Sequence, residues 1–104
     1  MTTDVERRRA PRLALSVPVR TPNRAPGKVF GVTRDVSAAG LYIYTESQDW
    51  REGSRIQVVF DFPAEVTGHT ATTMCGGTVV RAERVESLLG IAVRIDRISF
   101  LDKE

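Results

Sequence analysis

The sequence is poor in the residues on which disulfide frameworks, metal sites and most catalytic centres depend. Its 104 residues include one cysteine, Cys75, and one histidine, His69. A lone cysteine cannot form an intramolecular disulfide, and neither residue has a second ligand near it for a zinc site. Ser37 has no histidine base that the sequence places beside it, so a serine nucleophile is not expected. We therefore expect no enzyme, no metal and no cofactor.

Long apolar runs are missing as well. No run approaches the roughly 18 residues that a membrane-spanning helix needs, and the charged N-terminus lacks the apolar segment of a secretion signal. Together with the missing disulfide framework, these absences favour a cytoplasmic protein. The length and the 41% of hydrophobic residues fit one compact domain with a modest core.

Positive charge is concentrated near the N-terminus, although the formal net charge is only +2. Seven cations fall within the first 28 residues, at Arg7, Arg8, Arg9, Arg12, Arg20, Arg24 and Lys28. Residues 1–12 show no apolar period, and Pro11 disfavours a helix through the arginines. We therefore expect residues 1–12 to be a flexible arginine-rich arm that binds an anionic partner.

Alternation of apolar and polar residues predicts about six strands and little or no helix. The expected strands are Leu13–Arg20, Lys28–Arg34, Leu41–Thr45, Arg55–Phe62, Thr70–Val85 and Leu89–Asp96. Gly76-Gly77 interrupts the fifth of these and predicts a bulge or a sharp bend. A helix that begins at Asp96 would be too short to be stable alone. Short connections between so many strands predict an all-β, six-stranded antiparallel barrel over residues 13–98, with a tail at 99–104.

Three other features have ordinary structural explanations. We expect His69 to be a solvated loop residue and Cys75 to pack as a small apolar side chain. Trp50, Tyr42 and Tyr44 could be stacking surfaces, but we expect Trp50 to cover one end of the core and the two tyrosines to form part of a sheet face.

The stretch Asp35–Gly40 connects the second and third expected strands. Aspartate, serine and glycine are ordinary turn residues, so it predicts a tight turn. It also sets a carboxylate two residues before a hydroxyl, followed by a glycine that can adopt positive φ or admit a ligand close to the backbone. Guanidinium groups bind phosphate and stack on purines, whereas Asp35 can accept from guanine N–H groups. The arm and the turn together suit a ligand that contains both guanine and phosphate.

Arg8-x-x-x-Arg12 followed by Asp35-x-Ser37-x-x-Gly40 resembles the two-part signature of the PilZ domain, a bacterial family that binds cyclic di-GMP. The glycines Gly53 and Gly77 and the run Gly90-Ile91-Ala92-Val93 resemble later landmarks of that family, so the resemblance extends from Glu6 to about Ile98. Many members continue into a C-terminal helix, and this sequence stops where that helix would begin.

The resemblance implies a six-stranded antiparallel barrel that acts as a non-enzymatic cyclic di-GMP receptor on an unidentified protein target. It implies that the arm with Arg8 and Arg12 orders over the barrel mouth and holds ligand against Asp35, Ser37 and Gly40, with Arg9 as a further contact. An arginine at position 7 implies two stacked cyclic di-GMP molecules per chain.

Two other functions stay open at this point. One is a small barrel that binds nucleic acid through its basic arm, against which the low net charge argues. The other is a PilZ-like protein-interaction module that binds no ligand. Cyclic di-GMP binding with a defined stoichiometry would separate the receptor from both.

Overall fold

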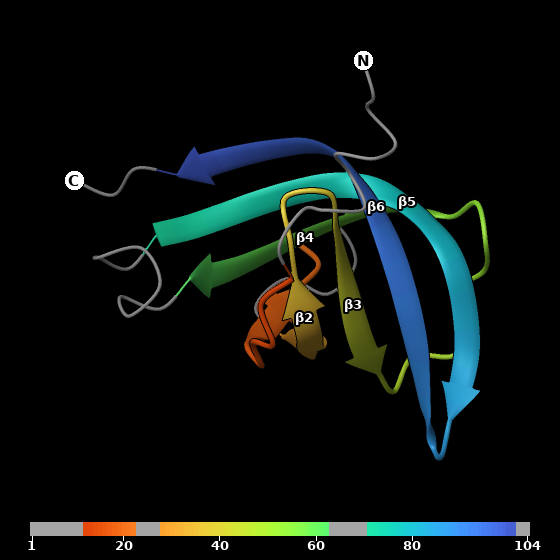
Figure 1. Cartoon of the computed structure of the whole chain (residues 1–104). Coiled ribbons are helices and arrows are strands. Elements are labelled where there is room, and N and C mark those ends of the chain that lie inside the picture. Colours follow the sequence, from red (N-terminus) through yellow and green to blue (C-terminus); the bar gives the residue numbers. More distant parts are fainter. Residues whose placement is uncertain (1–11, 23–27, 63–70, 102–104) are drawn as a thin grey trace.

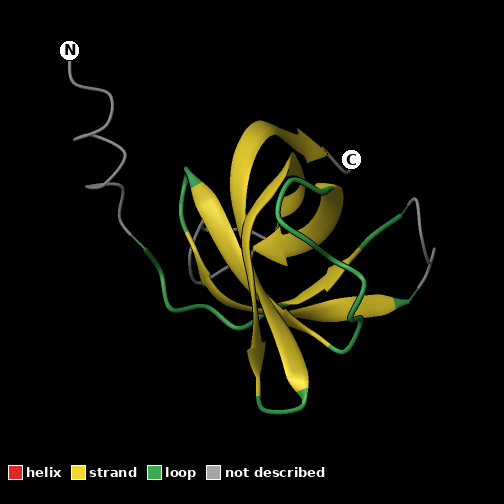
Figure 2. Ribbon diagram, turned by 90° about the vertical axis from the view of Figure 1, so that its right-hand side faces the viewer, coloured by secondary structure: helices red, strands yellow, loops and turns green. Residues whose placement is uncertain are grey.

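The protein is described by a computed structural model over residues 12–22, 28–62 and 71–101, a part that contains strands and loops but no helix (Figure 2). Its strands are β1 (Pro18–Arg20), β2 (Val29–Val36), β3 (Gly40–Thr45), β4 (Arg55–Phe62), β5 (Ala71–Val85) and β6 (Leu88–Leu101). They close into an antiparallel barrel in the order β1-β2-β3-β6-β5-β4. The predicted all-β barrel of six strands is confirmed, and the described residues include no helix that could cross a membrane.

The two longest strands, β5 and β6, pair along their whole length and curve around the shorter strands (Figure 1). Their register shifts between Gly76, which is opposite Arg97, and Gly77, which is opposite Ile95. This confirms the bulge expected at the two glycines. A Cβ at Gly77 would lie 2.2 Å from the carbonyl oxygen of Arg94, so the two backbones approach too closely for a larger residue.

The first strand is shorter than its alternating pattern predicted, because a side chain replaces part of the ladder. Only Pro18–Arg20 is a strand, while Leu13 forms an isolated bridge with Val36. Between these points the Thr33 hydroxyl accepts from the Val17 amide at 3.0 Å and donates to the carbonyl oxygen of Leu15. The segment before β1 is thus bound to β2 through Thr33 as well as through backbone groups.

The last strand is longer than predicted. β6 continues to Leu101, and residues 98–101 pair with residues 72–75 of β5. No helix begins at Asp96 as far as Leu101, in agreement with the expectation that a helix there would be too short to be stable alone. Pairing with β5 supplies the backbone hydrogen bonds that an isolated single helical turn could not have retained.

Strand β3 has one face in the barrel core and an opposite face that carries Tyr42 and Tyr44. Its Leu41 and Ile43 are almost fully buried in the barrel core with Phe60, Val79 and Ile91. Cys75 and Trp50 are also buried in this core, as expected from the sequence. Because side chains alternate along a strand, Tyr42 and Tyr44 lie on the opposite face of β3, with ring centroids 5.4 Å apart.

Candidate functional site

The turn between β2 and β3 is braced by its own serine. The Ser37 Oγ accepts hydrogen bonds from the amides of Ala39 and Gly40, each at 3.1 Å, and the Ser37 amide donates to the carbonyl oxygen of Gly40 at 2.8 Å. The tight turn predicted for this stretch is therefore present. Its serine oxygen is engaged in holding the turn, which fixes where the hydroxyl points.

Gly40 is required by a close backbone approach. A Cβ at this position would lie 2.7 Å from the carbonyl oxygen of Val93, which is on the neighbouring strand β6. Among the described glycines only Gly53 has positive φ. Gly40 is thus a glycine because β6 approaches it, not because of positive φ, and the close approach of a ligand at this position stays a prediction.

Asp35 joins the end of the arginine arm to the barrel. Its Oδ1 accepts from Nη1 of Arg12 and its Oδ2 accepts from Nε of Arg34 at 2.7 Å, while the residue itself is only 8% exposed. Leu13 and Val36 exchange two backbone hydrogen bonds of 2.8 and 3.0 Å beside this ion pair. Arg12 is therefore anchored to the turn by both a side-chain and a backbone connection.

Arg34 extends this network to Tyr42. The Arg34 guanidinium carbon lies 3.9 Å from the centroid of the Tyr42 ring, and its hydrogen bond to Asp35 is the main cause that raises the pKa of Arg34. The Tyr42 hydroxyl donates to Oε2 of Glu83 at 2.5 Å. Burial, and then the Glu83 carboxylate, raise the pKa of Tyr42 to about 12, so the phenol is neutral at physiological pH.

These groups surround a cavity of about 500 Å³, a volume in the range of small-molecule sites. Its lining includes no carboxylate among the described residues; it consists of Arg12, Arg34, Ser37, Ala39, Gly40, Leu41, Tyr42, Val80, Arg81, Ala92, Val93 and Arg94. Four guanidinium groups therefore offer hydrogen-bond donors and positive charge to the cavity. The arrangement suits an anionic ligand with a planar polar group.

Each of the four arginines has a carboxylate partner that does not itself line the cavity. Asp35 holds Arg12 and Arg34, Glu83 lies 3.6 Å from Arg81, and Asp96 lies 3.4 Å from Arg94. Asp96 also accepts from Arg55 at 2.6 Å, which is the main cause that lowers its pKa. These contacts restrict the arginine side chains before any anion arrives, which reduces the entropy lost on binding.

The predicted site residues fall into three groups. Arg12, Ser37 and Gly40 line the cavity, and Asp35 lies behind it as the partner of Arg12. Arg7, Arg8 and Arg9 lie outside the described residues. The sequence did not single out Arg34, Arg81 and Arg94, which line the same cavity. Tyr42 also lines it, and the sequence indicated this residue only as a stacking surface or as part of a sheet face. Of the three arginines, only Arg34 had a signal in the sequence, since it directly precedes Asp35.

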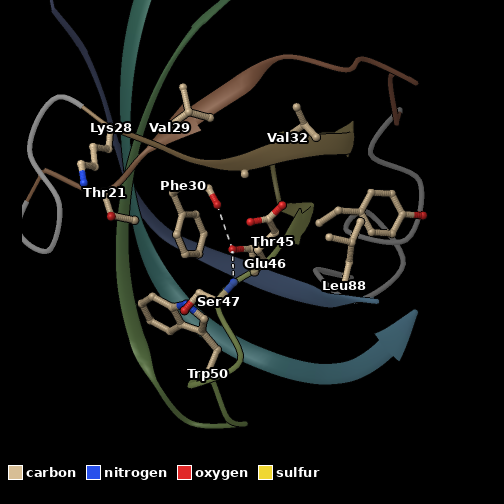
Figure 3. Close-up of a pocket in the computed structure, with 12 residues that line it drawn as sticks. Thr21, Lys28, Val29, Phe30, Val32, Thr45, Glu46, Ser47, Trp50 and Leu88 are labelled. Carbon is tan, nitrogen blue, oxygen red and sulfur yellow. Dashed lines mark hydrogen bonds between the residues drawn. The ribbon is translucent and has the colours of Figure 1, made fainter. Parts of the chain in front are cut away.

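A second cavity, of about 570 Å³, lies at the other end of β3 (Figure 3). Apolar groups dominate its lining, and the rings of Phe30 and Trp50 meet edge to face in it, with centroids 5.4 Å apart. None of its lining residues belongs to the predicted motifs, and its charged members are Lys28 and Glu46. Although larger, this cavity lacks the cluster of cations that an anionic ligand needs.

Nowhere in the described ranges do three or more metal-ligating side chains cluster.

Comparisons with known proteins agree with this geometry. No curated protein matches the sequence. Among solved structures, the Bacillus subtilis inhibitor of motility, MotI/DgrA, superposes with a TM-score of 0.69 at 15% identity, over 85% of this chain and 42% of that one. The chain thus spans about two fifths of that protein, and the likeness shows a common fold. The sequence model described as the PilZ domain matches residues 6–104, so this chain belongs to the PilZ domain family.

Proposed function

We propose that this protein is a non-enzymatic receptor for cyclic di-GMP, and that the liganded surface is read by a protein target. The observation that supports this most is the cavity beside the Ser37–Gly40 turn, into which four arginines with fixed partners converge. Membership of the PilZ family supports the same ligand class. MotI/DgrA is described as an inhibitor of motility, but a likeness at 15% identity does not transfer that role.

In this proposal the two halves of the site have different tasks. Arg12, with Arg7, Arg8 and Arg9 of the arm, binds the ligand phosphates through charge-assisted hydrogen bonds. The turn supplies Ser37 and Gly40, which both line the cavity, although Gly40 itself is buried. Asp35 holds Arg12 and Arg34, which take two of the about four acceptor positions of its carboxylate. Because Asp35 does not line the cavity, its proposed acceptance from a guanine edge requires that ligand binding uncover this carboxylate.

The energetics favour an arm that is anchored at one end. Ordering a residue costs about 1–2 kcal/mol in backbone entropy. Each charge-assisted hydrogen bond returns about 1.5–3 kcal/mol. Because Arg12 and Leu13 already contact Asp35 and Val36, fewer residues remain to be ordered when the phosphates bind. Arg7 supports two stacked ligand molecules per chain in this account.

Isothermal titration calorimetry of the full chain with cyclic di-GMP at moderate salt tests the proposal. We expect saturable heat for the parent protein and a loss of tight binding in Arg8→Ala and Arg12→Ala. Arg51→Ala removes one exposed cation outside the cavity lining and should leave the affinity within about twofold, as expected for a screened charge.

Two results would contradict the receptor. The absence of heat and of spectral change on addition of cyclic di-GMP would rule it out. Binding of single-stranded RNA with a steep salt dependence, together with indifference to cyclic di-GMP, would favour the nucleic-acid alternative instead.

A further inference from the structure

Arg34 is outside the two-part signature, yet it is among the most tightly positioned cations of the cavity. Its Nε donates to Asp35 at 2.7 Å, and its guanidinium carbon lies over the Tyr42 ring, 3.9 Å from the centroid. The first contact directs the guanidinium edge toward Asp35, and the second sets one face of it against the ring. The side chain nevertheless stays 47% exposed and lines the cavity.

Tyr42, the support beneath Arg34, is itself held at several points. Its hydroxyl donates to Glu83 at 2.5 Å, and its ring meets Tyr44 edge to face at an interplanar angle of 72°. The hydroxyl end lies over Gly90, where a Cβ would come within 2.1 Å of it. Four strands therefore fix this pair, because Arg34 is on β2, Tyr42 on β3, Gly90 on β6 and Glu83 on β5.

A guanidinium with one face covered by an aromatic ring has one face left for a second planar group. We propose that the free face of Arg34 is a stacking surface for a purine base of the bound cyclic dinucleotide. This inference rests on the receptor function proposed above and adds a base-binding residue to it. The arm arginines then bind phosphate, and Arg34 on the barrel selects for a large planar base.

The chemistry of arginine explains why a lysine would not serve here. A guanidinium is planar and weakly hydrated, and it stacks on π systems while its edge still donates to a carboxylate. A lysine ammonium keeps the charge and can still pair with Asp35, but it has no planar face on which a base could stack. Stacking depends on the area of the base, so purines should benefit more than pyrimidines.

The test compares Arg34→Lys and Arg34→Ala with the parent and with Arg51→Ala as a charge-matched control. Calorimetry with cyclic di-GMP should show a loss of about tenfold for Arg34→Lys and a larger loss for Arg34→Ala, with Arg51→Ala unchanged. Circular dichroism and thermal unfolding of each variant establish that it is folded. Arg34→Lys keeps the partner of Asp35 and is therefore the decisive variant.

A second measurement separates stacking from a merely structural role for Arg34. In NMR spectra of the saturated complex, nuclear Overhauser effects should connect guanine H8 with the side-chain protons of Arg34. Parent-like affinity of Arg34→Lys, or the absence of these effects in a saturated complex, would overturn the inference while the receptor stands. No binding by the parent protein would overturn both.

Discussion

The hydroxyl group of Tyr42 occupies the space in which any residue other than glycine at position 90 would place its Cβ. A Cβ on Gly90 would lie 2.1 Å from the Tyr42 oxygen and 2.8 Å from Cζ, well inside van der Waals contact. Gly90 is opposite both Tyr44 on β3 and Glu83 on β5, so it is the gap across which Tyr42 reaches Glu83. The missing side chain at Gly90 thus determines the position of Tyr42, whose ring packs against the Arg34 guanidinium.

Substitution Gly90→Ala should therefore displace the Tyr42 ring and break its hydrogen bond to Glu83. We expect a loss of about 1–3 kcal/mol in the free energy of unfolding, the usual cost of overpacking, and weaker cyclic di-GMP binding because Arg34 loses its support. Urea unfolding and calorimetry measure the two effects.

Gly76→Ala is the matched control for this substitution. It changes a glycine in β5 whose added Cβ would meet nothing nearer than the Arg97 Cβ at 4.0 Å. An alanine there should be neutral or stabilising by about 0.5–1 kcal/mol, since glycine is unfavourable in a strand interior. Equal stabilities of the Gly90 and Gly76 variants would show that Tyr42 does not depend on the gap.

Asp35→Asn removes the charge that holds both Arg12 and Arg34. The residue is buried and accepts two charge-assisted hydrogen bonds, so we expect unfolding to become easier by about 1–3 kcal/mol. Cyclic di-GMP affinity should fall as well, because the two arginines lose their fixed positions. Chemical denaturation and calorimetry provide the readouts.

Asp61→Asn makes the same chemical change at an exposed carboxylate, which accepts from the Thr72 hydroxyl at 2.7 Å. Its effect should stay within about 0.5 kcal/mol, as for most surface substitutions. If the Asp35 variant behaved like the Asp61 variant in both stability and binding, Asp35 would not have the anchoring role.

Tyr42 should make stability depend on pH in the alkaline range. Its pKa is about 12 in the folded protein and 10.0 as the ordinary value, so the folded state retains the phenolic proton more strongly. This contribution is complete below pH 10 and is lost as pH rises from 10 through about 12. The difference in urea midpoint between the parent and Tyr42→Phe should be constant below pH 10 and should shrink above it. A difference that stayed constant across this range would contradict the assignment.

Cys75 should be chemically inert while the barrel is folded. Burial raises the pKa of its thiol from 9.0 to about 11, and the residue is 2% exposed. A shift of this size lowers the thiolate fraction at pH 8 by about a hundredfold, in addition to the steric protection. Reaction with a disulfide reagent should be slow in the native protein and fast in urea. Similar rates in the two conditions would mean that the thiol is accessible.

The fold could be predicted largely from local pattern. Arg55–Phe62 alternates so regularly that its bounds were predicted correctly, and the adjacent glycines indicated the bulge in β5. The bounds of β1 and β6 were predicted wrongly, because contacts with other parts of the barrel determine where these strands begin and end. The Thr33 side chain replaces part of the first ladder, and β5 extends β6 to Leu101. A single sequence does not show either partner.

The site could be predicted only in part, because some of its residues belong to sequence motifs and others are brought there by the order of the strands. Arg12 belongs to one of the two sequence motifs and Ser37 with Gly40 to the other, and all three line one cavity. Arg81 and Arg94 reach that cavity only because β5 and β6 close the barrel beside β3, where Arg94 pairs with Gly40 and Arg81 with Ala92. Contacts that depend on strand order cannot be read from the spacing of residues. The role of the arm residues before Arg12 remains a prediction.

A titration of the ¹⁵N-labelled protein with cyclic di-GMP, monitored by NMR, shows which of the two cavities binds the ligand. We predict saturable shifts at the amides of Ser37, Ala39, Gly40 and Arg94, which line the arginine cavity, and an unchanged Trp50 indole signal in the apolar one. Shifts centred on Trp50 and Leu88 with a silent Ser37–Gly40 turn, or no shifts at all, would contradict this prediction.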